Sequence, residues 1–278
     1  MEVAQCHIRY ESRTDVFRIW GIGDIHREDP QCALKELRET VKEIAGDPYS
    51  YWFGLGDYGS FINWQDVKRF DPRQVVLQAS DLGKLHEVVL ELVAKELDPI
   101  GTKCLGVCDG NHEETYQRHH SVSIVAKLAE RWNTLYLDYS AAVRILFHDH
   151  ADTHRASSLH LYLFHGSGGG ALKGGKALKL ARYFTSHPWA DVIFSAHQHD
   201  LVALSEACTD ILWPGGAARR GRFGVRKRYA LMVGGFRHTH SQPGIPASYS
   251  ERMGHGITAP GAVWVTFKPS TRETHAII

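Results

Sequence analysis

The segment 102–113 reads Thr-Lys-Cys-Leu-Gly-Val-Cys-Asp-Gly-Asn-His-Glu and joins two kinds of sequence. The run from Cys104 to Cys108 is apolar and predicts a buried strand. It is followed by Asn111, His112 and Glu113, which place an amide, an imidazole and a carboxylate side by side. A Gly-Asn pair alone is an ordinary turn signal, and a hydrogen-bonded loop explains it well. Whether the segment has a function therefore depends on partners elsewhere in the chain.

Four other apolar segments end in the same way, with a polar side chain able to bind a metal ion just after a predicted strand. These strands are 17–22, 51–55, 159–164 and 191–196, and they are followed by Asp24, His26, Asp57, His165, His197 and His199. In an open α/β sheet the carboxyl ends of the strands face one crevice, where ligands bind. The sequence therefore predicts that these side chains meet Asn111 at one edge of the sheet material.

The chemistry of this predicted group favours a metal centre. It contains imidazoles, carboxylates and an amide oxygen but no thiolate, a set that suits Mn, Fe or Zn. Asp24 and Asp57 supply enough negative charge for two divalent ions if one carboxylate bridges them. Two such ions about 3.5–4 Å apart can hold a hydroxide and bind the oxygens of an in-line displacement at phosphorus. We therefore expect two divalent cofactor ions, of which Mn is favoured.

The ordered series Asp-x-His, Gly-Asp, Gly-Asn-His-Glu, His and His-x-His resembles the motifs of the calcineurin-like metallophosphoesterases. It lies within residues 21–199, in the order typical of that family. The resemblance implies an α/β fold, a two-sheet β-sandwich flanked by helices in four α/β/β/α layers. It further implies that Asp24, His26 and His199 bind one metal ion, that Asn111, His165 and His197 bind the other, that Asp57 bridges them, and that His112 protonates the leaving oxygen.

The chain departs from the family pattern close to this proton donor. Many members have a second aspartate three residues after Asp57, where this chain has Ser60. In those members, the second aspartate orients the catalytic imidazole. In this chain, Asp109 or Glu113 could take over that role, or the imidazole of His112 has no carboxylate partner. A weaker general acid would favour substrates with good leaving groups. Asp109 and Phe61 also stand near positions where the protein Ser/Thr phosphatases carry arginines, which disfavours that branch.

Two further segments bear on the substrate. The glycine-rich segment 166–170, followed by 173–176, resembles one in phage-type and DNA-repair-nuclease-like members. It could hold a phosphate near a helix N-terminus, or be a mobile surface loop. The basic run from Arg219 to Arg228 predicts either contacts with a nucleic-acid backbone or a solvated, salt-bridged face. Arg27 and Arg118 lie near the metal motifs in sequence, and we expect them to bind the substrate phosphate.

The remaining histidines are weaker signals. His148, His150 and His154 lie between two predicted strands, where a hairpin loop explains them better than a second metal site. His238 and His240 repeat the His-x-His spacing but follow no clean buried strand, so we expect them not to be metal ligands.

Hydrophobic periodicity predicts the elements that surround these motifs. Helices are expected at 31–45, 72–97 (with an interruption near Gly83), 122–132 and 173–184. Strands are expected at 3–10, 16–22, 51–55, 102–108, 134–137, 142–147, 159–164, 191–196, 201–207, 211–213, 229–233 and 262–267. The first half alternates strand and helix and the second half is rich in strands. This order favours one layered α/β domain.

Composition limits the protein class. The 278 residues are 43% hydrophobic with a net charge of +1, which is ordinary for a soluble globular protein and too small for general attraction to nucleic acid. We expect a single domain over residues 1–278, with the metal motifs in 21–199 and with 200–278 completing the sheet and the substrate walls. Five cysteines without a Cys-x-x-Cys pair predict reduced thiols. Without a signal peptide or an apolar run of about 18 residues, we expect a cytoplasmic protein that does not enter membranes.

These observations together predict an enzyme, a dinuclear-metal-dependent phosphoesterase in which a metal-bridging hydroxide attacks phosphorus. Phosphodiesters of nucleotide or nucleic-acid type are the preferred substrates because of the glycine-rich segment and the basic run. The alternatives are a phosphomonoesterase, a metal-dependent hydrolase of another ester class, and a non-catalytic scaffold that binds other proteins. The scaffold is disfavoured because every predicted ligand position and His112 are chemically intact. The oligomeric state is left open.

Overall fold

The computed structural model describes residues 1–62, 64, 70–72, 77–78, 80–151, 156–169, 172–212, 220–240 and 242–277. The helices are α1 (Leu34–Gly46), α2 (Leu85–Leu97), α3 (Asn111–His120), α4 (Ile124–Arg131), α5 (Lys173–Ser186) and α6 (Tyr249–Arg252). The strands are β1 (Glu2–Tyr10), β2 (Phe17–Ile22), β3 (Ser50–Leu55), β4 (Cys104–Cys108), β5 (Ser140–Asp149), β6 (Ala156–Phe164), β7 (Val192–Ser195), β8 (Leu201–Leu212), β9 (Arg222–Val233), β10 (Val263–Lys268) and β11 (Glu273–Ile277). They form a six-stranded sheet of order β1-β5-β6-β7-β9-β8 and a five-stranded sheet of order β11-β10-β2-β3-β4.

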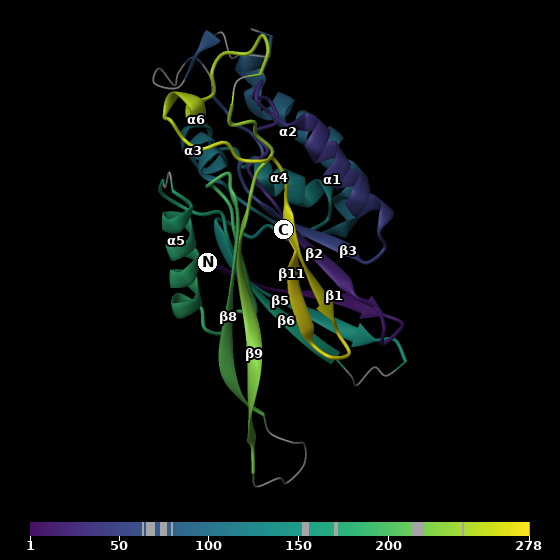
Figure 1. The fold of residues 1–278 in the computed structure, drawn as a ribbon. Helices are drawn as coiled ribbons and strands as arrows, with labels where there is room; N and C mark the ends of the chain where they lie inside the picture. The colour runs from purple at the N-terminus through teal and green to yellow at the C-terminus, as the bar shows by residue number, and fades with distance from the viewer. Residues whose placement is uncertain are drawn as a thin grey trace.

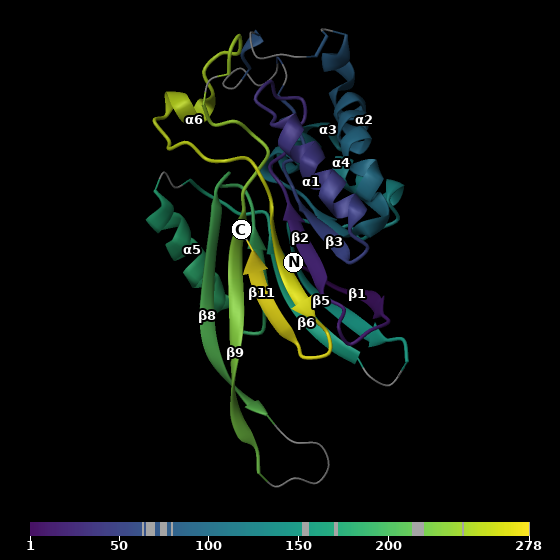
Figure 2. The ribbon, with the colours of Figure 1, turned by 45° about the vertical axis from the view of Figure 1, so that its right-hand side comes forward.

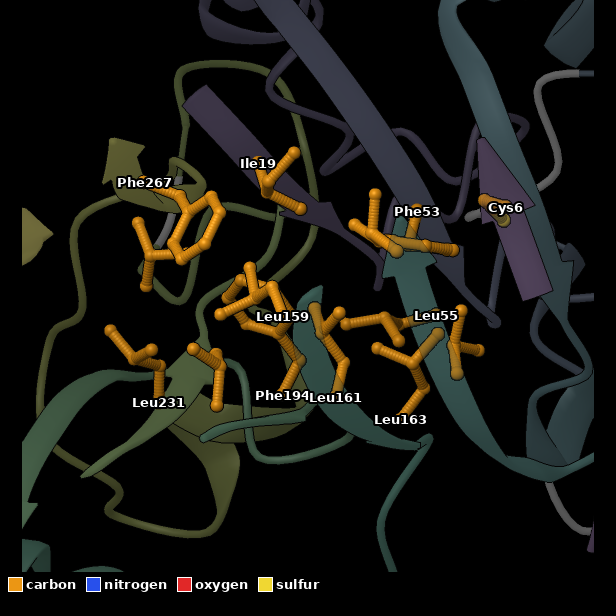
Figure 3. Packing of buried hydrophobic residues seen from close by; sticks show 14 of the residues in the cluster. Cys6, Ile19, Phe53, Leu55, Leu159, Leu161, Leu163, Phe194, Leu231 and Phe267 are labelled. Carbon is orange, nitrogen blue, oxygen red and sulfur yellow. The ribbon is translucent and has the colours of Figure 1, made fainter. Parts of the chain in front are cut away.

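The two sheets pack face to face, and their inner faces share one apolar core. Figure 3 shows Ile19 and Phe53 of the five-stranded sheet opposite Leu161 and Phe194 of the six-stranded sheet. All four side chains are fully buried. Burial of such a side chain contributes about 1.5–3 kcal/mol relative to exposure. The core therefore joins strands from both halves of the chain.

Helices cover the outer faces of the two sheets (Figures 1 and 2). Helices α1, α2 and α4 lie on the five-stranded sheet, where their apolar residues pack around Trp20 and Trp52. Helix α5 lies on the six-stranded sheet, where Leu180 and Phe184 pack with Ile193. Because β3 is covered on both faces, its sequence is almost continuously apolar, whereas β1 at a sheet edge alternates between buried and exposed residues. The predicted four-layer α/β/β/α sandwich is confirmed.

The directions of the strands position the candidate site. Strands β2, β3 and β4 run parallel to one another, and β6 runs parallel to β7. Parallel neighbours bring their carboxyl ends to the same edge of a sheet. The segments that follow these five strands meet at one end of the sandwich, where the predicted metal ligands lie.

Several elements differ from the prediction. Helix α3 begins at Asn111, where a turn was expected, and residues 134–137 contribute only an isolated bridge to β4. Helix α2 begins at Leu85, just after the expected interruption near Gly83, and residues 73–76 and 79 of the segment 72–97 lie outside the described residues. Strand β11 was not predicted. Strands β8 and β9 are each 12 residues long, and their hairpin projects beyond the sandwich (Figures 1 and 2). The predicted strands were shorter because the outer halves of β8 and β9 lack the apolar alternation by which a covered strand is identified in sequence.

All five cysteines are unpaired, as predicted, and Cys104 and Cys108 are buried in the sheet. Among the described helices, none has the length and apolar character required to cross a membrane. Strands contribute to the two sheets from residue 2 to residue 277. A single domain over residues 1–278 remains a prediction.

Candidate metal centre

Five of the seven predicted ligands have a left-handed backbone conformation in the segments that follow their strands. Asp24, His26, Asp57, His197 and His199 all have positive φ, between 47° and 71°. This conformation costs a non-glycine residue about 1–2 kcal/mol. Backbone strain of this kind is typical of functional sites, where the surrounding structure holds it in place.

A first group of ligand atoms comes from the turns after β2 and β7. One ligand atom each from Asp24, His26 and His199 lies within 4.8 Å of the others, and the two imidazole rings are stacked with their centroids 5.1 Å apart. Asp24 Oδ1, His26 Nε2 and His199 Nδ1 are buried and have no hydrogen-bond partner among the described residues. Buried polar atoms without partners are uncommon and costly. A cation between Asp24 Oδ1 and His26 Nε2 would satisfy both, so the residues fit a divalent metal ion.

A second group comes from the ends of β3, β4, β6 and β7. Ligand atoms of Asp57, His165 and His197 lie within 4.8 Å of one another. Asn111 Oδ1 joins them at 3.0 Å from His165 Nε2 and 2.7 Å from His197 Nδ1. The carbonyl oxygen of Leu55 lies 2.6 Å from His165 Nδ1 and accepts its proton, which leaves Nε2 facing the group. Such a hydrogen bond at the far ring nitrogen is the usual support of a metal-binding histidine.

Asp57 connects the two groups. Its Oδ2 lies 3.8 Å from His26 Nε2 of the first group and 3.3 Å from His165 Nε2 of the second. Its Oδ1 accepts the main-chain N–H of His112 at 3.0 Å. The structure thus brings all seven predicted ligands into one cluster and puts Asp57 at its middle. That these residues bind two metal ions remains a prediction.

The charges in the cluster are strongly coupled. Burial raises the pKa of Asp24 well above its ordinary value. Burial also acts to raise the pKa of Asp57, but the nearby imidazoles of His165 and His112 outweigh it and hold this pKa well below the ordinary range. Burial lowers the pKa of His199 to about 3 and that of His197 to about 4. Neutral imidazoles and an ionised bridging carboxylate are the forms that bind metals.

His165 differs from the other imidazoles. Burial acts to lower its pKa, but the carboxylates of Asp57 and Asp24 outweigh burial and raise it to about 10. A proton on His165 therefore balances these carboxylates when no other cation is near. A divalent ion bound by the same carboxylates would displace that proton.

His112 is oriented by a main-chain carbonyl. Its Nδ1 lies 2.7 Å from the carbonyl oxygen of Ser60, and its Nε2 lies 4.0 Å from Asp57 Oδ2. Its ring meets that of His26 edge-on at 4.9 Å between centroids. The imidazole therefore lies beside both groups of ligands with Nε2 turned towards them.

Neither carboxylate that was expected to replace the missing aspartate contacts this imidazole. Asp109 accepts a hydrogen bond from the hydroxyl of Tyr136. Glu113 is buried and accepts four main-chain N–H groups, from Asp57 (2.9 Å), Tyr58 (2.7 Å), Gly59 (3.2 Å) and Gly110 (3.0 Å). Of the three alternatives left open by the sequence, the absence of a carboxylate at His112 Nδ1 agrees with the structure, because Asp109 and Glu113 both have other partners. Glu113 instead ties the turn after β3 to the start of α3.

Two glycines permit the close approach of these turns. A Cβ on Gly110 would lie 2.2 Å from the main-chain nitrogen of Asp57. A Cβ on Gly235 would lie 2.8 Å from the Cβ of Asp24 and 3.3 Å from Nδ1 of His199. Gly235 was not predicted as part of the site, although the Gly-Gly pair after β9 was a possible signal of close backbone packing.

The predicted phosphate-binding arginines do not join the cluster. Arg27 forms an ion pair with Glu96, 2.9 Å from Nη2 to Oε1, and Arg118 pairs with Glu114 across one turn of α3. Their binding of substrate remains a prediction. A nearer cation is Arg237, whose charge helps to lower the pKa of both His26 and His199. Sequence reasoning missed it because no motif surrounds it.

The other segments with predicted roles have partners of their own. In the glycine-rich segment, the carbonyl oxygens of Ser167, Gly168 and Gly169 accept hydrogen bonds from Lys179 Nζ at 3.0–3.2 Å, so these oxygens gather around a cation. In the basic run, Arg226 pairs with Asp191 and Arg228 pairs with Glu206, while Arg220, Arg222 and Lys227 are exposed on the β8–β9 hairpin. Arg219 and residue 170 lie outside the described residues.

The other histidines named from the sequence do not join the ligand groups in the described part of the chain. His148 belongs to β5 and not to a loop, and its Nε2 is 2.8 Å from His7 Nδ1 on β1. Within the described ranges, the groups able to hold a metal include none of His148, His150, His238 and His240. His154 is outside the described ranges.

No family model and no curated protein matches the chain. Among solved structures, a conserved uncharacterised protein of Streptococcus pneumoniae, described as a predicted phosphoesterase, is 11% identical with a TM-score of 0.33 over 91% of this chain and 83% of that one. A metallophosphoesterase from Sphaerobacter thermophilus is 13% identical with a TM-score of 0.37, over 94% and 89% of the two chains. The NAD nucleotidase of Haemophilus influenzae is 8% identical with a TM-score of 0.44, over 95% of this chain but only 49% of its own.

At these identities and TM-scores the likeness to solved structures supports no conclusion about this chain, so its function is argued below from the residues of the candidate centre.

Proposed function

We propose that this protein is a metal-dependent phosphoesterase with two divalent ions, for which Mn is favoured over Fe and Zn. The observation that carries the proposal is the position of Asp57. One oxygen of its carboxylate lies 3.8 Å from His26 Nε2 and 3.3 Å from His165 Nε2, so one residue links two complete sets of ligand atoms. A protein that needed these residues only for packing would satisfy the buried polar atoms of Asp24 and His26 internally.

The residues have separate roles in this proposal. Asp24, His26 and His199 would hold one ion, Asn111, His165 and His197 the other, and Asp57 both. When bound, the ions supply an activated water and offset the charge on the phosphate oxygens. His112 keeps the proton on Nδ1 bonded to Ser60 and donates the proton on Nε2 to the leaving oxygen as its bond to phosphorus breaks. Such general-acid assistance contributes about 10²–10⁴-fold to the rate.

Metal removal and reconstitution test the proposal. We expect the chelated protein to be inactive towards bis(4-nitrophenyl) phosphate and Mn²⁺ to restore hydrolysis. Asp57→Asn should reduce the Mn²⁺-dependent rate to background, while Glu130→Gln, an exposed change on α4, should leave it unchanged. Activity that survives both chelation and Asp57→Asn would refute the proposal.

We further propose that phosphodiesters of the nucleotide or nucleic-acid type are the substrates. The exposed Arg220, Arg222 and Lys227 support this, since cations on a projecting hairpin can contact a phosphate backbone. The ion pairs of Arg226 and Arg228 weaken it, as does the use of the glycine-rich carbonyls by Lys179.

A panel of phosphomonoesters, phosphodiesters, cyclic nucleotides, single-stranded DNA and carboxyl esters under Mn²⁺ compares the candidates. Faster cleavage of monoesters would favour the phosphomonoesterase, cleavage of carboxyl esters alone would favour a different hydrolase, and inactivity with full metal binding would favour a protein-binding scaffold. A cytoplasmic location stays part of our proposal, and the five unpaired cysteines agree with it.

A further inference from the structure

Ser60 contacts two residues with different proposed roles. Its carbonyl oxygen lies 2.7 Å from Nδ1 of His112, the proposed proton donor. Its hydroxyl oxygen lies 3.0 Å from Nδ1 of His26, a proposed metal ligand. Both contacts are at the ring nitrogen that faces away from the metal cluster. The side chain at this position therefore serves the metal ligand, and only the main chain serves the proton donor.

The chemistry of these contacts sets the tautomer of both rings. A carbonyl oxygen can only accept, so His112 Nδ1 must carry a proton and Nε2 is the atom that exchanges protons. His26 Nε2 is buried with no hydrogen-bond partner in the described part of the chain, as a metal-binding nitrogen would be. Its Nδ1 then carries the proton, and the Ser60 hydroxyl accepts it.

Glu28 fixes the main chain that makes these contacts. Its Oε1 accepts the N–H groups of Ser60 at 2.8 Å and Phe61 at 2.7 Å. Phe61 has a left-handed backbone with φ of 50°, and its ring packs on Tyr116 of α3 with centroids 5.2 Å apart. Since α3 also carries His112, the segment 60–61 is held at one end by Glu28 and at the other by the helix that it supports.

We propose that Ser60 and Glu28 are positioning residues that take the place of an aspartate–histidine pair: the Ser60 hydroxyl orients the metal ligand His26, and Glu28 holds the Ser60 carbonyl that orients His112. This inference rests on the proposed function for the role of His112, but its metal-binding half does not need activity. Because one contact is made by a side chain and the other by the main chain, separate substitutions will separate the two effects.

Ser60→Ala tests the metal-binding half. It removes the hydroxyl and keeps the carbonyl. We expect Mn²⁺ to bind 10- to 100-fold more weakly, the usual effect of losing the partner of a metal-binding histidine. Chelator competition on the purified protein measures this, with Ser123→Ala, at the N-terminal cap of α4, as a control that also loses a hydrogen-bonded hydroxyl. Unchanged Mn²⁺ affinity in Ser60→Ala would overturn this half.

Glu28→Leu tests the half that concerns His112, and Glu28→Gln is its matched control, because glutamine retains an acceptor oxygen. The assay compares a 4-nitrophenyl phosphodiester with an alkyl phosphodiester at saturating Mn²⁺. A general acid matters most for the poor alkyl leaving group. We expect Glu28→Leu to lower kcat for the alkyl ester at least about 10-fold more than for the 4-nitrophenyl ester, within the 10²–10⁴-fold range of such catalysis. Glu28→Gln should keep the native ratio.

A purely structural role for Glu28 would lower both rates equally, and that result would overturn the second half. If Glu28→Leu does not fold, Glu28→Asp gives the same comparison, since its shorter side chain withdraws the acceptor from Ser60. A native protein that binds Mn²⁺ but hydrolyses neither ester refutes the proposed function and the role of His112. A native protein that hydrolyses both, with variants that behave like it, refutes only the inference about Ser60 and Glu28.

Discussion

Replacement of Glu113 by alanine should destabilise the protein far more than replacement of its neighbour Glu114. Glu113 is buried, and its carboxylate accepts four main-chain N–H groups from the turn after β3 and the start of α3. Glu114 lies on the exposed face of the same helix and pairs with Arg118 at 2.9 Å. The two substitutions are chemically identical and adjacent, so the difference between them reports the buried contacts.

The magnitude follows from these contacts. A hydrogen bond to a charged acceptor contributes about 1.5–3 kcal/mol, so four of them sum to about 6–12 kcal/mol. The sum is an upper bound, because burial penalises the carboxylate and raises the pKa of Glu113 to about 8. Water would also enter the space left by the side chain. We expect Glu113→Ala to lose about 3–5 kcal/mol, a large part of the roughly 5–15 kcal/mol that stabilises a domain. Glu114→Ala should lose about 0.5 kcal/mol or less.

Urea unfolding of the metal-free proteins, followed by tryptophan fluorescence at one pH, measures both losses. If Glu113→Ala does not fold, Glu113→Gln serves in its place. Glutamine keeps one acceptor oxygen, so we expect this variant to lose about 2 kcal/mol, between the losses of the two alanine variants. A loss in Glu113→Ala no larger than that in Glu114→Ala would refute the reasoning, since the four N–H groups would then have found other partners.

Three further outcomes are expected. Gly235→Ala places a methyl group 2.8 Å from the Cβ of Asp24. This variant should lose about 1–3 kcal/mol of stability and bind Mn²⁺ weakly in a calorimetric titration. Gly174→Ala, with nothing within 4 Å of the added Cβ, should show neither effect. Lys176→Met breaks a buried ion pair with Asp200 (3.1 Å) and should lose about 3 kcal/mol in urea, while Lys173→Met, which changes a 74% exposed side chain, should lose less than about 1 kcal/mol. Mn²⁺ at 100 times its Kd should stabilise the native protein by about 2.7 kcal/mol in the same assay, and no stabilisation would contradict a preformed metal site.

The members of the candidate metal centre could be predicted because each follows a strand that is covered on both faces. Such strands are almost continuously apolar, so their ends are visible in the sequence. Asp57 after β3 and His197 after β7 are examples, and both lie in the cluster. The parallel order of β2, β3 and β4 then brings the ends together. The gathering of these residues at the strand ends could therefore be predicted from the sequence, because the strands alone determine it.

The support of His112 could not be predicted in this way. The atom that orients the imidazole is the main-chain oxygen of Ser60, and no residue type encodes a main-chain oxygen. Motif reasoning compares side chains, so Ser60 reads as the loss of an aspartate. The start of α3 was missed for a related reason. Glu113 accepts the N–H of Gly110 at that helix start, and this depends on two turns that meet only in the folded chain.

The left-handed turns connect the stability of the fold with the candidate site. Asp24, His26, Asp57, His197 and His199 together carry a backbone cost of about 5–10 kcal/mol, as much as the net stability of many domains. Glycine would remove most of this cost but would also remove the ligand atom. A chain that keeps residues with metal-binding side chains at all five positions therefore holds them over the strand ends at a cost in folding stability. The well-packed sheets below them contribute the stability that offsets this cost. Within the described residues, Asp24 Oδ1 and His26 Nε2 have no partner, while the opposite atoms of the same side chains are held by the N–H of His197 (2.7 Å) and the hydroxyl of Ser60 (3.0 Å). The turns and these hydrogen bonds together therefore leave one atom of each side chain available to a cation.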